Sequence, residues 1–211
     1  LPISSGHYHN GTDMSAEGGT PVYAVLSGTV VDAFDDGDTG YDSYVRIASV
    51  IDGKTKYLTY YHTRPILSTG KNVNVGDQIS TIAIDHVHLI DYRIGEGMSG
   101  NQINAIRPDG GVQPYNDIWK PYIRYVKFLL DNTDKELNQF QLGNKIDIIV
   151  HVEEGNGTSS ASLNNGTYEI GYKLLSEDKQ TVVYSPPDDG LRFRYYNIPA
   201  NDYVSVNYYA K

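Results

Sequence analysis

Histidine is the residue type that points to chemistry in this chain. Five of the six histidines lie within the first 88 residues, and the sixth is His151. Histidine is a common metal ligand and the side chain that titrates near neutral pH. The first part of the chain is therefore where a chemical site is expected. Its histidines are His7, His9, His62, His86 and His88.

Two spacings among these residues matter. His9 precedes Asp13 by four residues, and Gly11 between them would allow a sharp turn that brings both side chains to one point. His86 and His88 are two residues apart in an apolar run, so on a strand their imidazoles point to the same face. Three nitrogen or oxygen ligands with a fourth position open to water are the pattern of a catalytic zinc site.

Either spacing alone has an ordinary structural explanation. A His-x-x-x-Asp match is frequent by chance, and a lone His-x-His is often only a surface feature. Here both occur in a β-type context, together with a third segment, Tyr60-Tyr61-His62. The combination favours one shared site over three unrelated surface features.

The elements that must position these residues are short strands. The first half of the chain has runs rich in Val, Ile, Tyr and Thr, separated by turn signals such as Asp52-Gly53. The glycine-rich stretch 96–115 loses the alternation of a strand and is expected to be a loop. We expect strands at residues 21–26, 28–34, 44–50, 56–61, 78–84 and 86–94.

The distal part of the chain repeats the β pattern, and its strand spacing indicates a small sandwich. Residues 131–138 are polar and read as a loop or a short helix. The expected strands here are 119–130, 145–152, 166–175, 181–184, 191–196 and 203–209. We therefore expect an all-β protein, with an antiparallel β-sheet domain over residues 1–119 and a small Ig-like β-sandwich over residues 120–211.

Composition and charge narrow the range of partners. The chain has 211 residues, of which 39% are hydrophobic and 20% charged, as in a globular protein. Seventeen basic and 26 acidic residues give a formal charge of −9, which disfavours nucleic acid and anionic membrane surfaces as partners. No apolar run is long enough to predict a transmembrane helix. Cysteine is absent, which excludes disulfides, thiol catalysis and cysteine zinc sites.

The histidine and aspartate motifs in the first half of the chain resemble those of the lysostaphin-type (LytM-like) zinc metallopeptidases of the bacterial cell envelope. The run from His9 to Asp13, followed by residues 19–24 and 28–30, is similar to the opening of that family. Residues 44–47, 60–62, 75–77 and 86–89 then follow in the family's order and approximate spacing. The resemblance covers roughly residues 6–108, and the combination of motifs is specific.

The resemblance implies a metal, a reaction and a location. It implies that His9, Asp13 and His88 bind zinc (Zn²⁺), and that His62 and His86 are the catalytic histidines that do not bind it. The reaction implied is metal-assisted hydrolysis of peptide cross-links in peptidoglycan by a monomeric, extracytoplasmic endopeptidase. One of the two catalytic histidines would take a proton from water and the other would bind the oxyanion, and the sequence does not assign these roles.

The chain also departs from the family pattern on both sides of His86. Residues 80–85 replace the usual Gly/Ser-rich approach, and Leu89-Ile90-Asp91 replaces the usual ending. Asp85 could accept a hydrogen bond from an imidazole or be a solvated turn carboxylate. Either Tyr60 or Tyr61 could assist, because alternation along a strand points only one of them at the site. All five site positions are present, so we expect an active enzyme.

Several alternatives stay open. The chain could be a non-catalytic envelope module that binds wall peptides or regulates a partner hydrolase, or a zinc peptidase acting on protein substrates such as glycine-rich peptides. His7 could reach the site but is expected at an exposed strand end. The acidic residues 35–42 could bind calcium or an amino group, but a solvated hairpin loop is favoured. Residues 104–108 resemble the segment that precedes a β-sandwich in longer envelope members, where docking, substrate orientation or spacing is the expected role.

Overall fold

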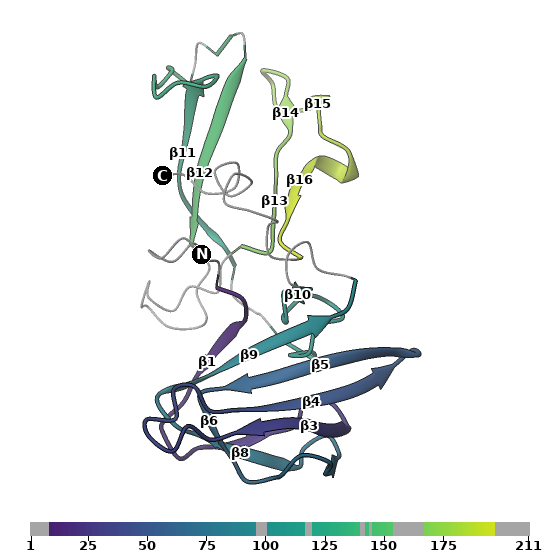
Figure 1. Ribbon diagram of the computed structural model, residues 1–211. Helices are drawn as coiled ribbons and strands as arrows, with labels where there is room; N and C mark the ends of the chain where they lie inside the picture. Colours follow the sequence, from purple (N-terminus) through teal and green to yellow (C-terminus); the bar gives the residue numbers. More distant parts are fainter. Residues whose placement is uncertain are drawn as a thin grey trace. The chain divides into compact units, whose positions relative to one another are not determined.

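A computed structural model describes residues 9–95, 101–116, 120–139, 142–143, 145–153 and 167–196. Two compact units make up the chain: the first runs up to Tyr115 and includes Tyr196, and the second runs from Asn116 to Tyr195 (Figure 1). All strand pairs in the described residues are antiparallel, and the helical structure there is one short 3-10 helix, Asp188–Gly190. The predicted antiparallel all-β fold is therefore confirmed. A membrane-spanning helix, long and apolar, is not found in these described ranges.

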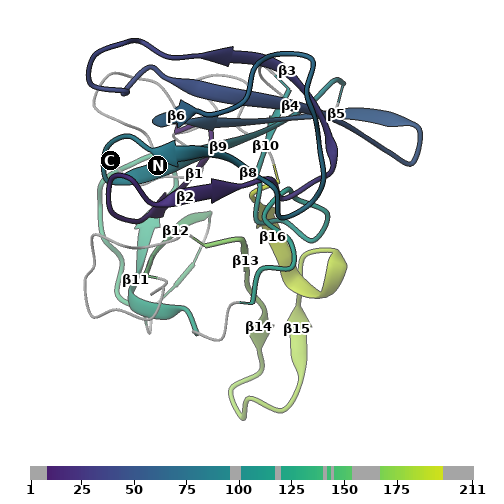
Figure 2. The same cartoon turned by 90° about the horizontal axis from the view of Figure 1, so that it is seen from below.

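The first unit is built on a seven-stranded antiparallel sheet (Figure 2). Its strands are β1 (Thr12–Ser15), β3 (Gly28–Phe34), β4 (Tyr44–Ile51), β5 (Lys54–Tyr61), β7 (Asn72–Val73), β9 (His86–Arg93) and β10 (Gln102–Ile103). They are ordered β1-β9-β5-β4-β3-β7, and β10 also pairs with β9. A three-stranded sheet is ordered β2-β8-β6, from β2 (Pro21–Tyr23), β8 (Gln78–Ile82) and β6 (Thr63–Pro65).

The hydrophobic core of the first unit lies on one face of the large sheet. Residues on a strand alternate between the two faces, so every second side chain of a strand can point into the core. In β9 this alternation buries Val87 and Leu89 in the core and sends His86 and His88 to the opposite face. The core residues are Val22, Ala24, Val30, Val45, Ile47, Leu58, Tyr60, Val73, Ile79, Ile82, Val87, Leu89 and Ala105. The core and the histidine face are thus set by the same alternation.

A buried ion pair closes the far end of β9. Arg93 donates from Nε to Oδ1 of Asp91 at 3.0 Å and from Nη2 to Oδ2 at 2.8 Å. Asp91 is 0% exposed and Arg93 2% exposed. The backbone N–H of Gly111 donates to Oδ2 of Asp91 at 2.9 Å, and Asp109 accepts from Arg93 as well. The pair therefore ties the segment around residues 109–111 to the sheet.

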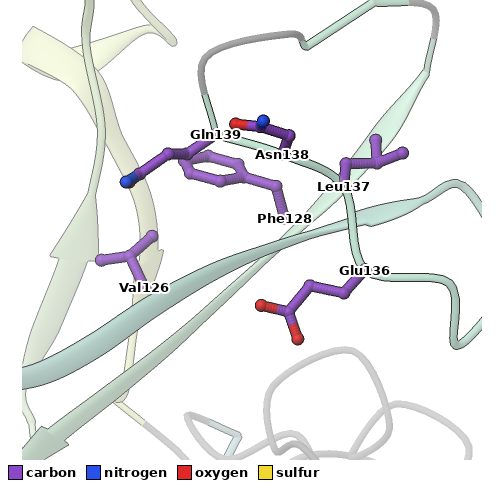
Figure 3. Close-up of a pocket in the computed structure, with 6 residues that line it drawn as sticks. All are labelled: Val126, Phe128, Glu136, Leu137, Asn138 and Gln139. Carbon is purple, nitrogen blue, oxygen red and sulfur yellow. The ribbon is translucent and has the colours of Figure 1, made fainter.

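The second unit consists of three two-stranded antiparallel sheets within its described residues. The pairs are β11 (Tyr122–Leu130) with β12 (Ile146–Glu153), β13 (Glu169–Gly171) with β16 (Leu191–Arg194), and β14 (Leu174–Leu175) with β15 (Val182–Tyr184). A hollow of about 320 Å³ beside β11 is lined by Val126, Phe128, Glu136, Leu137, Asn138 and Gln139 (Figure 3). The Ig-like sandwich over residues 120–211, and its boundary near residue 120, stay predictions.

The sequence predicts the positions of the longer strands, but it does not predict the shortest ones. The strands at 28–34, 44–51, 54–61 and 86–93 match their predictions to within two residues at either end. Strands β1, β6, β7 and β10 have two to four residues each, too few to show an alternating pattern. The single strand expected at 166–175 is divided between β13 and β14. The strand expected at 203–209 lies outside the described residues.

Candidate metal centre

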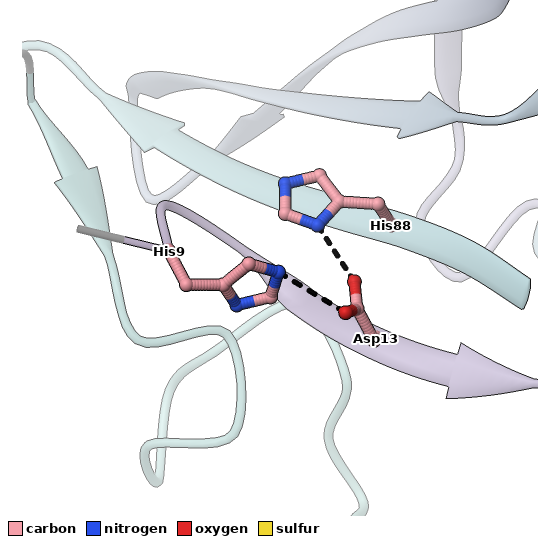
Figure 4. Close-up of side chains that lie close together, drawn as sticks. All are labelled: His9, Asp13 and His88. Carbon is pink, nitrogen blue, oxygen red and sulfur yellow. Dashed lines mark hydrogen bonds and ion pairs between the residues drawn. The ribbon is translucent and has the colours of Figure 1, made fainter. Parts of the chain in front are cut away.

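Pairing of β1 with β9 brings three predicted metal ligands together. Asp13 lies directly opposite His88 in the register of the two strands, so both side chains share one face of the sheet. Nδ1 of His88 is 2.7 Å from Oδ1 of Asp13. His9, just before β1, places Nε2 at 3.1 Å from Oδ2 of the same carboxylate (Figure 4). One ligand atom from each of the three residues lies within 4.8 Å of the others.

Gly11 makes this convergence possible by leaving room for His88. A Cβ atom on Gly11 would lie 2.6 Å from Nε2 of His88 and 2.6 Å from the carbonyl oxygen of Leu89. No side chain fits at such distances without moving the imidazole or the strand. The sequence pointed to a sharp turn at this glycine, but its φ is not in the left-handed region. The structure instead requires glycine for the close approach of β1 to His88.

The donor set fits a zinc ion. Two imidazole nitrogens and a carboxylate are among the ligands that zinc prefers in proteins. Burial disfavours the charged form of Asp13, but hydrogen bonds with His88 and His9 outweigh it and lower the pKa of the carboxyl well below its usual range. The carboxylate is therefore ionised and ready to bind a cation. The side chain of Asp13 is 44% exposed, so the cluster of His9, Asp13 and His88 is open to solvent.

Asn10 supports the cluster, a role that sequence reasoning missed. Its Oδ1 lies 3.0 Å from Nε2 of His88. An amide oxygen only accepts hydrogen bonds, so Nε2 of His88 donates to Asn10, and with a cation bound between His88 and Asp13 the Nδ1 lone pair would be free to bind it. Metal-binding histidines commonly have such a partner on the second ring nitrogen. The only sequence signal was the position of Asn10 next to His9.

Replacing Asn10 with alanine is expected to weaken zinc binding by about 10- to 100-fold, because loss of a partner of this kind typically has that cost. Competition with a chelator of known affinity measures the change. Asn10→Asp, which keeps an acceptor oxygen at this position, is expected to retain tight binding. Asn72→Ala, a change on strand β7, serves as the control. Equal zinc affinity in Asn10→Ala and the wild type would contradict this role.

His62 and His86, the two predicted catalytic histidines, border the cluster without belonging to it. Their ring centroids are 4.8 Å apart. Nε2 of His86 lies 3.8 Å from Oδ1 of Asp13, and the ring of His62 is 6.0 Å from that of His88. Nδ1 of His86 lies 2.7 Å from Oδ1 of Asp85. The sequence allowed Asp85 to be either a solvated carboxylate or a partner of an imidazole. In the structure it is both, because its side chain is 87% exposed and contacts His86.

A loop conformation that the sequence does not reveal orients His62. The residue lies between β5 and β6 with a φ of 61°, in the left-handed region that residues other than glycine seldom adopt. Nδ1 of His62 contacts the carbonyl oxygen of Tyr41, and the two rings are 4.5 Å apart. Because a carbonyl oxygen accepts, Nδ1 carries the hydrogen and Nε2 has a free lone pair. Burial, together with the charges of His86 and His88, lowers the pKa of His62 and favours this neutral form.

The acidic loop that carries Tyr41 is held by its own backbone, as expected of a hairpin loop. The carboxylate of Asp36 accepts hydrogen bonds from the backbone N–H groups of Asp38, Gly40 and Asp42, at 3.0, 2.9 and 3.3 Å. The loop lies within residues 35–43, which connect β3 to β4. The loop thus fixes the position of the carbonyl group that orients His62.

Of the two neighbouring tyrosines, Tyr61 faces the cluster. It lies opposite His88 in the register of β5 and β9, and the two ring centroids are 6.3 Å apart. Tyr60 is buried in the core, where its hydroxyl accepts from the N–H of Val25 at 3.1 Å and burial raises its pKa to about 12. His7 lies outside the described residues. His151 is exposed in the second unit, where its ring packs 5.2 Å from that of Tyr125.

The segment that contains this site matches a known family. Residues 7–89 match the sequence model of Peptidase family M23. The matched segment is similar to the M23 peptidases and makes up less than half of the chain. It includes all five predicted site residues. No curated protein matches the chain.

Three solved structures are similar to the chain over different shares of its length. The catalytic domain of a mutant of the prophage-encoded M23 protein EnpA from Enterococcus faecalis is 25% identical, with 49% of this chain and 81% of that chain covered and a TM-score of 0.40. CbpA from L. salivarius REN is 24% identical, with 42% and 58% covered and a TM-score of 0.33. The antimicrobial peptidase lysostaphin from Staphylococcus simulans is 14% identical, with 92% of each chain covered and a TM-score of 0.39.

Proposed function

We propose that the unit matched by the M23 family model is a zinc endopeptidase that hydrolyses the peptide cross-links of bacterial peptidoglycan. One observation carries the proposal: His88 meets Asp13 from 75 residues away in the sequence, His9 joins them, and two further histidines stand beside the cluster. A structural metal site would not need these two additional imidazoles. An extracytoplasmic location and a monomeric state belong to the same proposal.

In this proposal Nε2 of His9, the carboxylate of Asp13 and Nδ1 of His88, which converge in the structure, would hold the ion. Bound zinc would lower the pKa of water towards neutrality and polarise the scissile carbonyl. Asn10 would keep His88 in the tautomer that leaves Nδ1 free. The exposure of Asp13 would leave one side of the site accessible to a substrate.

The contacts of the two remaining histidines differentiate their roles. Asp85 beside Nδ1 of His86 would stabilise a positive charge on that ring. We therefore assign His86 as the general base that takes a proton from water and passes it to the leaving amine. The Tyr41 carbonyl fixes His62 with Nε2 unprotonated, so neutral His62 would accept a hydrogen bond from water or from a substrate N–H group.

Zinc content and cleavage of purified sacculi, measured together on the full chain, test the proposal. We expect the wild type to bind an equimolar amount of zinc and to release new amino groups from sacculi. His86→Ala is expected to keep its zinc and to lose about 10²- to 10⁴-fold in rate, the usual contribution of a general base. The exposed His151→Ala is the matched control. A protein that binds zinc but cleaves no wall preparation would instead be a non-catalytic module, and cleavage of glycine-rich peptides alone would indicate a protein substrate.

A further inference from the structure

A row of aromatic side chains runs across the large sheet to the metal centre. In the register of the strands, Phe34 pairs with Tyr44, Tyr44 with Tyr61, and Tyr61 with His88. Residues paired in this way point to the same face of a sheet. The centroids of successive rings are 6.0, 5.0 and 6.3 Å apart. Phe34, Tyr44 and Tyr61, here named the aromatic row, thus lead without a gap to a candidate zinc ligand.

The aromatic row lies at the surface and has no part in the mechanism above. Phe34 is 47% exposed, and Tyr44 and Tyr61 are partly exposed. The hydroxyl of Tyr44 donates to Oδ2 of Asp32 at 2.7 Å, and the guanidinium of Arg46 lies 5.6 Å from the ring centroid. These contacts hold the ring of Tyr44 in place. Aromatic surfaces of this kind bind a partner with little loss of side-chain entropy.

The spacing of the strands sets what the aromatic row can hold. Neighbouring strands are about 4.8 Å apart, so Tyr44 on β4 is about 10 Å from the position of His88 on β9, and Phe34 on β3 about 14 Å. An extended peptide advances about 3.3–3.6 Å per residue. A chain lying across the strands would therefore reach Tyr44 at about its third residue from the metal centre and Phe34 at about its fourth.

We propose that the aromatic row binds an extended segment of the substrate peptide, three to four residues long, on one side of the bond that is cut. The inference rests on the proposed function, since that function places the scissile bond at the cluster of His9, Asp13 and His88. The peptide joined to that bond is then the part of the substrate that reaches the adjoining surface. Aromatic faces suit it because they contact Cα–H groups and planar peptide groups favourably.

A series of peptides of increasing length, measured with the full, zinc-loaded chain, tests the inference. Oligoglycine and oligoalanine peptides of two to six residues are compared for binding, by calorimetry, and for cleavage. In the wild type, affinity is expected to rise once a peptide reaches Tyr44. Tyr44→Ala is expected to lose about tenfold in affinity and in kcat/KM for the long peptides only, as for a central aromatic contact. Tyr44→Phe, which keeps the ring, is expected to retain the gain, and the exposed Tyr23→Ala on β2 is the control.

The outcomes separate this inference from the proposed function. An equal loss for short and long peptides, or no loss at all, would overturn the role of the aromatic row even if the wild type cleaves them. Weaker binding of a peptide-free wall disaccharide by Tyr44→Ala would also overturn it, because the row would then hold sugar. If the wild type binds the long peptides through Tyr44 but cleaves no peptide or sacculus, the peptide-binding role of the aromatic row is supported and the peptidase proposal is refuted.

Discussion

Replacing His88 with alanine is expected to remove zinc from the protein and to lower the cleavage of sacculi by at least about 10³-fold. The change deletes the one ligand that β9 contributes to the cluster and leaves Asp13 with His9 alone. A metal ion contributes several kcal/mol to the stabilisation of the transition state, and each 1.36 kcal/mol is a factor of ten in rate. Metal analysis and the release of amino groups from sacculi measure the two effects.

Two variants make this result interpretable. His86→Ala removes an imidazole two residues away on the same strand and should keep its zinc, so it separates a ligand from a base. His151→Ala makes the same chemical change at an exposed site in the second unit and should change neither zinc content nor rate. If His88→Ala retains stoichiometric zinc and a wild-type melting temperature, the ion is bound elsewhere and the assignment of the metal centre is wrong.

Replacing Asp91 with alanine is expected to lower the free energy of unfolding by about 3–5 kcal/mol, the usual cost of removing one member of a buried ion pair. The change removes the two Asp91 oxygens that bind Arg93, which is 2% exposed and keeps its contact with Asp109, and it also removes the acceptor for the N–H of Gly111. Urea unfolding of the full chain, followed by tryptophan and tyrosine fluorescence, measures the loss.

The control for this prediction is an exposed carboxylate in the second unit. Asp134→Ala, in the turn after β11, is expected to change the free energy of unfolding by less than about 0.5 kcal/mol, as surface substitutions usually do. If Asp91→Ala were no more destabilising than Asp134→Ala, Asp109 and water would be sufficient to satisfy Arg93. The departure from the family pattern at Asp91 would then have no structural consequence.

The sequence predicted the parts of the fold and of the site that depend on local patterns. Alternation alone placed His86 and His88 on one face of a strand, and the structure confirms that Val87 faces the core. The convergence of His9, Asp13 and His88 was also anticipated, although spacing left both histidines of the pair open and only the resemblance selected His88. The prediction for β9 succeeded because a side chain's direction on a strand is fixed by its immediate neighbours. The roles of the five site residues stay predictions.

The remaining features depend on contacts between distant segments. The left-handed φ of His62 and its contact with Tyr41 arise where the loop between β3 and β4 meets the end of β5. Neither segment has a sequence pattern that predicts this contact. The contact of Asn10 with His88 needs the register of β1, a strand too short to be recognised. The role of Asp91 could not be read from the sequence because Arg93 and Gly111 become its partners only through folding.

The register between β1 and β9 has a consequence for the stability of the sheet edge. Strand β1 is a four-residue edge strand, and Asp13 reaches His88 only when the two residues are directly opposed. A slip of one residue would turn Asp13 towards the core face and separate it from His88. An ion that binds both side chains would therefore also hold β1 against β9. Metal binding and the pairing of β1 with β9 are then thermodynamically linked, so each stabilises the other.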